Sequence, residues 1–276
     1  MPEGQISFHI QHIARPMHIE RILDIASNDQ ALYAESSHLC LTQDGYQITL
    51  DGARRSLNLG KKLGLFEKSD RSAYTLTERG QACRDLALYR REVYGEVMHF
   101  LLFATWEFRD HQDYWSWSYA RVCENFWHDR PEIKSYKAIF GQLSAAASRE
   151  FSGLDPVVGT ETVYAVTNWL RELSPPFFAL KDAKPIASRE REWFSTELAL
   201  LAVSYLYAAR GVAIQTPILL DRPTVEQLCP LCLAPVEHIM AMIETASRTF
   251  PFLDIHTGEW GSSAILQQAV DIPMLS

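Results

Sequence analysis

The stretch from residue 49 to residue 80 constrains the fold more than any other part of the chain, because helix starts and a helix end follow each other closely there. Thr49 is placed to cap a helix, and Gly64 suits the left-handed residue that closes it. Thr77 can cap the next helix, whose first turn carries the favourable carboxylate of Glu78. Only short extended structure fits between these signals.

Two short strands are predicted between those helices. Residues 65–68 and 73–76 have the patterns of strands, and the polar residues 69–72 predict a turn between them. Upstream, residues 19–26 repeat apolar side chains at helical spacing, and residues 39–45 are interpreted as a connection. The predicted order is therefore helix, connection, helix, β-hairpin, helix.

Leu63–Glu67 and Tyr74–Gly80 resemble the wing region of bacterial winged helix-turn-helix proteins. In many of those proteins a helix ends in a leucine-glycine-leucine step before a hairpin, and a leucine-threonine-x-x-glycine sequence starts the next helix. The resemblance covers about a third of the chain. It implies a winged helix over residues 1–92, in which the helix after Thr49 would lie in the major groove of duplex DNA.

This helix carries the residue types that contact DNA. If Leu57 and Leu63 face the core, its polar and basic side chains fall mainly on the outer side. Arg and Asn suit the edges of guanine and adenine because each forms paired hydrogen bonds, and cations of the hairpin would reach nearby phosphates. The candidate DNA-binding residues are Arg54, Arg55, Asn58, Lys61 and Lys62 of the helix, with Lys68 and Arg71 of the hairpin.

Charge is distributed unevenly along the chain. The whole sequence has a net charge of −8 and a pI near 5.6, which argues against a generally basic surface. Between Asp51 and Glu92, ten basic residues stand against six acidic ones, which leaves about +4. From Ala213 to the end, two basic residues stand against seven acidic ones, which leaves about −5. We therefore expect phosphate to be attracted to the first region and repelled by the last.

Residues 93–195 are interpreted as an aromatic-rich helical domain, a small bundle. The aromatic run at residues 114–119 has two interpretations. Its side chains could stack on exposed bases, but beside Phe126 and Trp127 they fit a buried core better. The fold class expected for the whole chain is mainly α with small β-hairpins.

The last third, residues 196–276, is interpreted as a second winged helix, degenerate and acidic. A strongly apolar helix is predicted at residues 197–209, a short helix at 224–232 and another helix after Pro235. Two strands would then flank a hairpin loop at residues 256–261. An ordinary α+β terminal subdomain is the alternative.

Cys229 and Cys232 have the spacing of a zinc knuckle, and His238 and His256 would complete four ligands. A second Cys-x-x-Cys pair does not occur, and cysteines at the end of an apolar helix are more often small buried residues. A redox pair is a further alternative, but nothing nearby in the sequence lowers a thiol pKa. We expect no metal and no cofactor.

Five cysteines, an odd number, and the lack of a signal-peptide pattern after Met1 favour a reducing, cytoplasmic environment. The longest apolar stretch, residues 198–209, is shorter than the ~20 residues that span a bilayer. We therefore expect no membrane association.

The sequence contains no motif of a P-loop, a serine hydrolase or a zinc protease, so we expect no enzyme. We expect a DNA-binding protein whose helical middle and acidic end contact a partner protein or a second copy. The alternative is an adaptor subunit that does not bind DNA itself. In layout the chain is similar to acidic tandem winged-helix proteins of chromosome-organising complexes, and to accessory subunits of bacterial DNA-modification or antiviral phage-defence systems.

Overall fold

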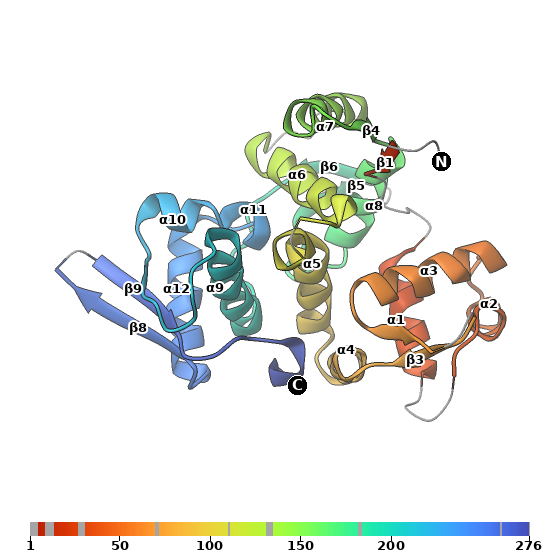
Figure 1. The fold of residues 1–276 in the computed structure, drawn as a ribbon, viewed down its shortest axis with the longest axis horizontal. Helices are drawn as coiled ribbons and strands as arrows, with labels where there is room; N and C mark the ends of the chain where they lie inside the picture. The colour runs from red at the N-terminus through yellow and green to blue at the C-terminus, as the bar shows by residue number, and fades with distance from the viewer. Residues whose placement is uncertain are drawn as a thin grey trace.

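The chain has three parts, an N-terminal unit, a central segment and a C-terminal unit, and the long helix α5 (Arg91–Phe108) of the central segment lies between the other two (Figure 1). The chain is mainly helical, with small sheets of two or three strands, which agrees with the expected class. The computed structural model describes residues 5–8, 14–26, 31–69, 72–109, 111–130, 135–181, 184–259 and 261–275.

The N-terminal unit, residues 14–89, packs helices against a short hairpin. Its elements are α1 (Pro16–Ile25), α2 (Ala34–Gln43), α3 (Leu50–Lys62), β2 (Phe66–Lys68), β3 (Tyr74–Leu76) and α4 (Glu78–Tyr89). β2 and β3 pair antiparallel. Leu32, which precedes α2, forms an antiparallel bridge to Tyr74 of β3 through two backbone hydrogen bonds of 2.7 and 2.9 Å.

Local signals in the sequence set the ends of α3 and α4, as predicted. The Thr49 hydroxyl accepts a hydrogen bond from the amide of Gly52 at 3.1 Å, and the Thr77 hydroxyl accepts one from the amide of Gly80 at 3.0 Å. Gly64 follows α3 with a φ of +76°, the left-handed region that glycine enters most easily. The helix boundaries therefore depend on contacts within a few residues.

Two glycines allow the hairpin to approach its neighbouring helices closely. A Cβ on Gly80 would lie 2.1 Å from the carbonyl oxygen of Leu65, and a Cβ on Gly60 would lie 2.6 Å from the ring of Phe66. Because neither distance is possible for a real Cβ atom, larger residues would push the hairpin away from α3 and α4.

The prediction of a connection at residues 39–45 was wrong, because α2 covers Ala34–Gln43. Only three residues of this helix, Ala34, Ser37 and Leu41, are buried, and one of them is polar. The apolar periodicity is consequently weak, and packing against α1 and α3 stabilises a helix that the sequence pattern does not indicate.

The central segment combines helices with two short strand pairs. Besides α5, its elements are α6 (Tyr114–His128), α7 (Tyr136–Glu150), β4 (Asp155–Val157), α8 (Glu161–Leu170), β5 (Phe178–Lys181) and β6 (Lys184–Ser188). β5 and β6 pair antiparallel, while β4 pairs in parallel with β1 (Gln5–Ser7). A purely helical bundle was therefore an incomplete prediction. Strands of three to five residues give little sequence signal, and the partners β1 and β4 lie far apart in the chain.

Aromatic side chains fill the centre of this segment. The Phe8 ring lies 4.9 to 5.3 Å from the ring centroids of Tyr114, Phe151 and Trp117. Trp115, Trp117 and Tyr119 are all buried. The interpretation of the aromatic run as core is confirmed.

The C-terminal unit, residues 196–266, ends in a three-stranded antiparallel sheet of order β7-β9-β8. The predicted helix at 224–232 is divided into two short helices, and the strands extend into the predicted loop at 256–261, so the loop is shorter than expected. The unit's elements are α9 (Thr196–Arg210), β7 (Ile218–Leu219), α10 (Arg222–Glu226), α11 (Cys229–Cys232), α12 (Val236–Thr249), β8 (Leu253–Gly258) and β9 (Gly261–Leu266).

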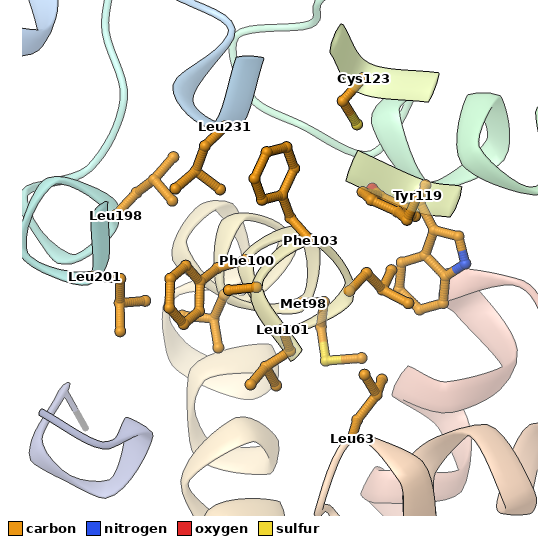
Figure 2. Close-up of a cluster of buried hydrophobic side chains, with 14 of the residues drawn as sticks. Leu63, Met98, Phe100, Leu101, Phe103, Tyr119, Cys123, Leu198, Leu201 and Leu231 are labelled. Carbon is orange, nitrogen blue, oxygen red and sulfur yellow. The ribbon is translucent and has the colours of Figure 1, made fainter. Parts of the chain in front are cut away.

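α5 joins the three parts through one continuous set of buried apolar side chains. Figure 2 shows Leu63 of the N-terminal unit, Tyr119 of α6, and Leu198, Leu201 and Leu231 of the C-terminal unit around this helix. A 3₁₀ helix, η1 (Ile272–Leu275), returns the end of the chain to α4. In the described part of the chain, no helix is long and apolar enough to cross a lipid bilayer.

Candidate nucleic-acid interface

α3 has one face in the core of the N-terminal unit and the opposite face in solvent. Ala53 and Leu57 are buried, and the helix packs against α1, α2 and β2. Arg54, Asn58 and Lys61 are exposed and follow one another at i, i+4 and i+7, which places them on one side of the helix. These three side chains lie outward as the spacing predicts, and their role in binding stays a prediction.

The hairpin orients Asn58. The hydroxyl of Tyr74 donates a hydrogen bond of 2.7 Å to Asn58 Oδ1. Burial raises the pKa of the Tyr74 phenol, which the nearby charge of Arg54 opposes, so the hydroxyl stays protonated and remains a donor. The ammonium of Lys68 lies 5.8 Å from the centre of the Tyr74 ring. Sequence reasoning missed Tyr74, because its position beside α3 depends on how the hairpin folds back.

Arg55 is less available than its neighbours on α3. Its Nε lies 2.6 Å from a carboxylate oxygen of Asp51, one turn earlier. Both side chains are exposed enough for water to weaken the pair, with exposed fractions of 37% and 55%. Asp51 shares its helix face with Arg54, so Arg55 also compensates a negative charge that would repel phosphate.

Lys62 lies in a different environment, although it was grouped with the other basic residues of α3. Its ammonium is 5.8 Å from the centre of the Trp115 ring, on helix α6. The side chain as a whole remains exposed, but burial around the ammonium lowers its pKa, which the charge of Asp113 opposes. Lys62 therefore faces the central segment rather than the surface shared by Arg54 and Lys61.

Much of the remaining positive charge between residues 51 and 92 is paired with acids from other parts of the chain. The pairs are Arg79–Asp271, Arg90–Glu197 and Arg91–Glu20, with N–O distances of 2.7, 2.5 and 3.2 Å. The excess of about +4 in this region consequently overstates the charge available to a ligand. Arg71, a candidate of the hairpin, lies outside the described residues.

The corresponding surface of the C-terminal unit is acidic. Glu237 and Glu244 are exposed on α12 about two turns apart, and Arg248 is exposed one turn after Glu244. Asp254 of β8 accepts a hydrogen bond from the side chain of Gln267 at 2.6 Å. A phosphate backbone would meet mainly negative charge on this side of the unit.

Cys229 and Cys232 are buried, free thiols at the two ends of α11. Burial raises the pKa of Cys229 to about 11 and raises that of Cys232 further, which disfavours the thiolate that a metal or a redox reaction needs. His238 Nδ1 lies 3.2 Å from the carbonyl oxygen of Arg191, and His256 belongs to β8. Within the described ranges, no three His, Cys, Asp or Glu side chains gather as a metal site would require.

A buried ion pair joins α5 to Arg191, in the segment between β6 and α9. This segment contacts the C-terminal unit, because the Arg191 guanidinium donates to the carbonyl oxygen of Cys232 at 3.4 Å and the Arg191 amide donates to that of Leu233 at 2.9 Å. Arg191 and Glu96 are almost completely buried and contact each other directly. The Arg191 guanidinium also donates to the carbonyl oxygens of Ser174 at 2.8 Å and Pro175 at 3.1 Å, while the amide of Ser195 donates to Glu96 at 2.9 Å. Sequence reasoning missed this network because its members are far apart in the chain. Every partner is internal, which indicates a structural role.

Comparisons with known proteins concern the fold. No family model matches the sequence, and no curated protein matches it. A solved structure described as "SspB crystal structure" is similar to this chain with a TM-score of 0.59. The alignment covers 95% of this chain and 82% of that chain at 10% sequence identity, so the likeness spans the N-terminal unit, the central segment and the C-terminal unit, and it shows the fold alone.

Proposed function

We propose that the N-terminal unit is a winged helix that binds duplex DNA, with α3 as the helix that enters the major groove. The order of elements supports this proposal. Helix α1 is followed by Leu32, which pairs with β3 as a strand would, then by α2, α3 and the β2–β3 hairpin, which would be the wing. α3 also exposes Arg54, Asn58 and Lys61 on the side opposite its buried residues.

The observation that carries the proposal is the set of Arg54, Asn58 and Lys61 on one exposed face of α3. Arg54 and Lys61 form no ion pair with any described acidic residue, so their charges remain available to phosphate or to guanine. Asn58 uses one lone pair of Oδ1 for Tyr74, and the second lone pair and the amide hydrogens can still engage an adenine edge.

The footprint on DNA should be small. Arg54, Lys61 and Lys68 are the described cations best placed on α3 and the hairpin, because Arg55 is paired and Lys62 faces Trp115. Three phosphate contacts predict a slope of about −3 when the logarithm of the binding constant is plotted against that of the salt concentration. Affinity should fall about fortyfold between 50 and 200 mM salt.

Fluorescence anisotropy with a labelled duplex tests the proposal. The double variant R54E/K61E should lose more than about tenfold in affinity, since two attractive charges become repulsive. The matched control is K137E/R149E, which makes the same change of charge on exposed positions of α7. If both variants lose affinity equally, only the net charge matters and the role of α3 is rejected. If the unaltered chain does not bind duplex at low salt, DNA binding is rejected altogether.

A second function, an adaptor that acts by protein contact, is favoured by the acidic face of α12. Glu237 and Glu244 are exposed on the helix before the second hairpin and are seven residues apart, the same spacing as Arg54 and Lys61 on α3. A basic partner protein would complement this face. This function predicts no DNA affinity of the isolated chain and a stably co-purifying subunit that E237K/E244K releases. A co-purifying subunit that remains bound to the variant would contradict it.

A further inference from the structure

A cavity of about 320 Å³ lies where the N-terminal unit, α5 and the end of the chain meet. One part of its wall is apolar and includes Leu63, Phe100, Leu101 and Leu201. Figure 2 shows Leu101 projecting from α5 with Leu63 on one side and Leu201 on the other. Each of the two units therefore contributes a leucine to this apolar wall.

The rest of the wall carries an excess of positive charge. Three cations line the cavity, Lys62, Arg79 and Arg109. Arg79 pairs with Asp271 at 2.7 Å and Arg109 pairs with Asp113 at 3.3 Å. Lys62 forms no ion pair with a described acid, and Asp113, which acts on it at longer range, is already paired with Arg109. Among the described residues, Asp271 and Asp113 pair with two of these three cations, and the third, Lys62, has no carboxylate of its own.

Few described groups compensate the charge of the Lys62 ammonium at this cavity. Burial lowers its pKa, and the centre of the Trp115 ring lies 5.8 Å from it. A cation that is partly withdrawn from water gains from an anion that can accept its hydrogen bonds. The volume corresponds to about ten water-sized volumes of ~30 Å³ each, which is space for a small molecule of roughly ten non-hydrogen atoms.

We propose that this cavity binds a small amphipathic carboxylate, whose anionic group pairs with Lys62 and whose apolar chain lies against Phe100, Leu101 and Leu201. Small-molecule sites commonly combine an apolar wall with a few converging polar groups, and they occur at junctions between domains. The inference goes beyond DNA binding and does not depend on it.

Isothermal titration calorimetry with three probes of matched length tests the site. Octanoate has the required charge and size, octan-1-ol lacks the charge, and octylammonium has the opposite charge. Octanoate should bind at least about tenfold more tightly than either other probe, because only octanoate neutralises Lys62. A failure of octanoate to saturate the protein at about 10 mM, or equal affinity for all three probes, would overturn the proposal.

Variants locate the binding. K62Q should abolish the preference for octanoate over octan-1-ol, whereas K137Q, an exposed position of α7, should preserve it. A104F should block all three probes, because Ala104 is buried and lines the cavity. If A104F does not fold, K62Q and K137Q decide the outcome alone. Equal effects of K62Q and K137Q would place binding elsewhere and reject the site.

Discussion

Up to the end of their hairpins, the N-terminal and C-terminal units have the same order of elements, but the exposed faces of α3 and α12 carry opposite charges. In the first, α1, Leu32, α2, α3 and the β2–β3 hairpin follow one another, and Leu32 pairs with the last strand. In the second, α9, β7, α10 with α11, α12 and the β8–β9 hairpin follow one another, and β7 again pairs with the last strand. The helix before the hairpin exposes Arg54 and Lys61 in one unit and Glu237 and Glu244 in the other.

The comparison shows that this topology fixes the position of the exposed helix face before the hairpin but does not fix the charge that this face carries. Buried positions keep each unit folded, while the exposed residues give α3 positive charge at Arg54 and Lys61 and give α12 negative charge at Glu237 and Glu244. The first helices differ as well. α1 buries one side only, whereas all residues of α9 from Glu197 to Ser204 are buried, because α9 packs against both α5 and α12.

The largest expected effect concerns how the C-terminal unit is attached. R191M leaves the Glu96 carboxylate buried without its counter-charge, which should lower the free energy of unfolding by about 3–5 kcal/mol. R222M is the control, since Arg222 has an exposed fraction of 71% and its loss should cost less than about 1 kcal/mol. Urea unfolding measures both changes. Hydrogen exchange should show larger losses of protection in α9 and α11 than in α3, and equal losses would contradict a selective attachment.

Low pH should weaken the contact between α5 and the C-terminal unit. Burial lowers the pKa of His99 to about 4; its Nε2 lies 2.7 Å from the carbonyl oxygen of Leu231, and its Nδ1 lies 2.9 Å from the Tyr119 hydroxyl. The unfolded chain takes up this proton near pH 6.5, so stability should fall by up to about 3 kcal/mol as the pH drops from 6.5 to 4.

The variant H99Q isolates this contribution, because glutamine can still donate to Leu231 and does not titrate. Urea unfolding at pH 7 and pH 4.5 should show a smaller acid loss in H99Q than in the unaltered chain. Carboxylates contribute to the pH dependence of both proteins and cancel in the difference. Identical pH dependence would show that His99 is not kept neutral by burial.

The close packing of the first hairpin predicts an effect of intermediate size. G80A places a Cβ against the carbonyl oxygen of Leu65, which should cost about 1–3 kcal/mol of unfolding free energy. G141A is the matched control in helix α7, where nothing lies within 4 Å of the added carbon. That control should stabilise the chain by about 0.5–1 kcal/mol, because glycine weakens a helix interior. Thermal unfolding of the two variants should therefore shift in opposite directions.

The smallest effect tests whether charge alone separates α3 from α12. E237K/E244K should raise affinity for duplex DNA roughly threefold to tenfold at low salt, because the acidic face of α12 becomes basic. E161K/E192K makes the same change of charge at exposed positions elsewhere and serves as the control in anisotropy titrations. An equal gain in both variants would reduce the contrast between the units to net charge.

Short-range features were the ones that the sequence could predict. Thr49, Gly64 and Thr77 act within a few residues, so the sequence pattern alone locates the ends of α3 and α4. α2 escaped prediction because its burial pattern is too weak to show a period. The pairing of β1 with β4 escaped prediction because nothing in either three-residue segment identifies a partner so far away.

For the candidate site as well, the sequence could predict what depends on nearby residues and could not predict what depends on distant ones. Helical spacing alone put Arg54, Arg55, Asn58, Lys61 and Lys62 mainly on the outer side of α3, and in the structure Arg54, Asn58 and Lys61 share one exposed face. Lys62 lies apart from this group because its ammonium is near Trp115, a residue of another part of the chain. The cavity beside Lys62 forms only where residues from three parts of the chain come together.

The amino-acid order by itself determined most of the helices, the first hairpin and the side of α3 that turns outward, because backbone hydrogen bonding and amphipathic spacing act over a few residues. Only the tertiary structure decided that Arg79, Arg90 and Arg91 are neutralised, since Asp271, Glu197 and Glu20 reach them through folding. The physical reason is that ion pairs depend on distance in space, which a sequence does not contain.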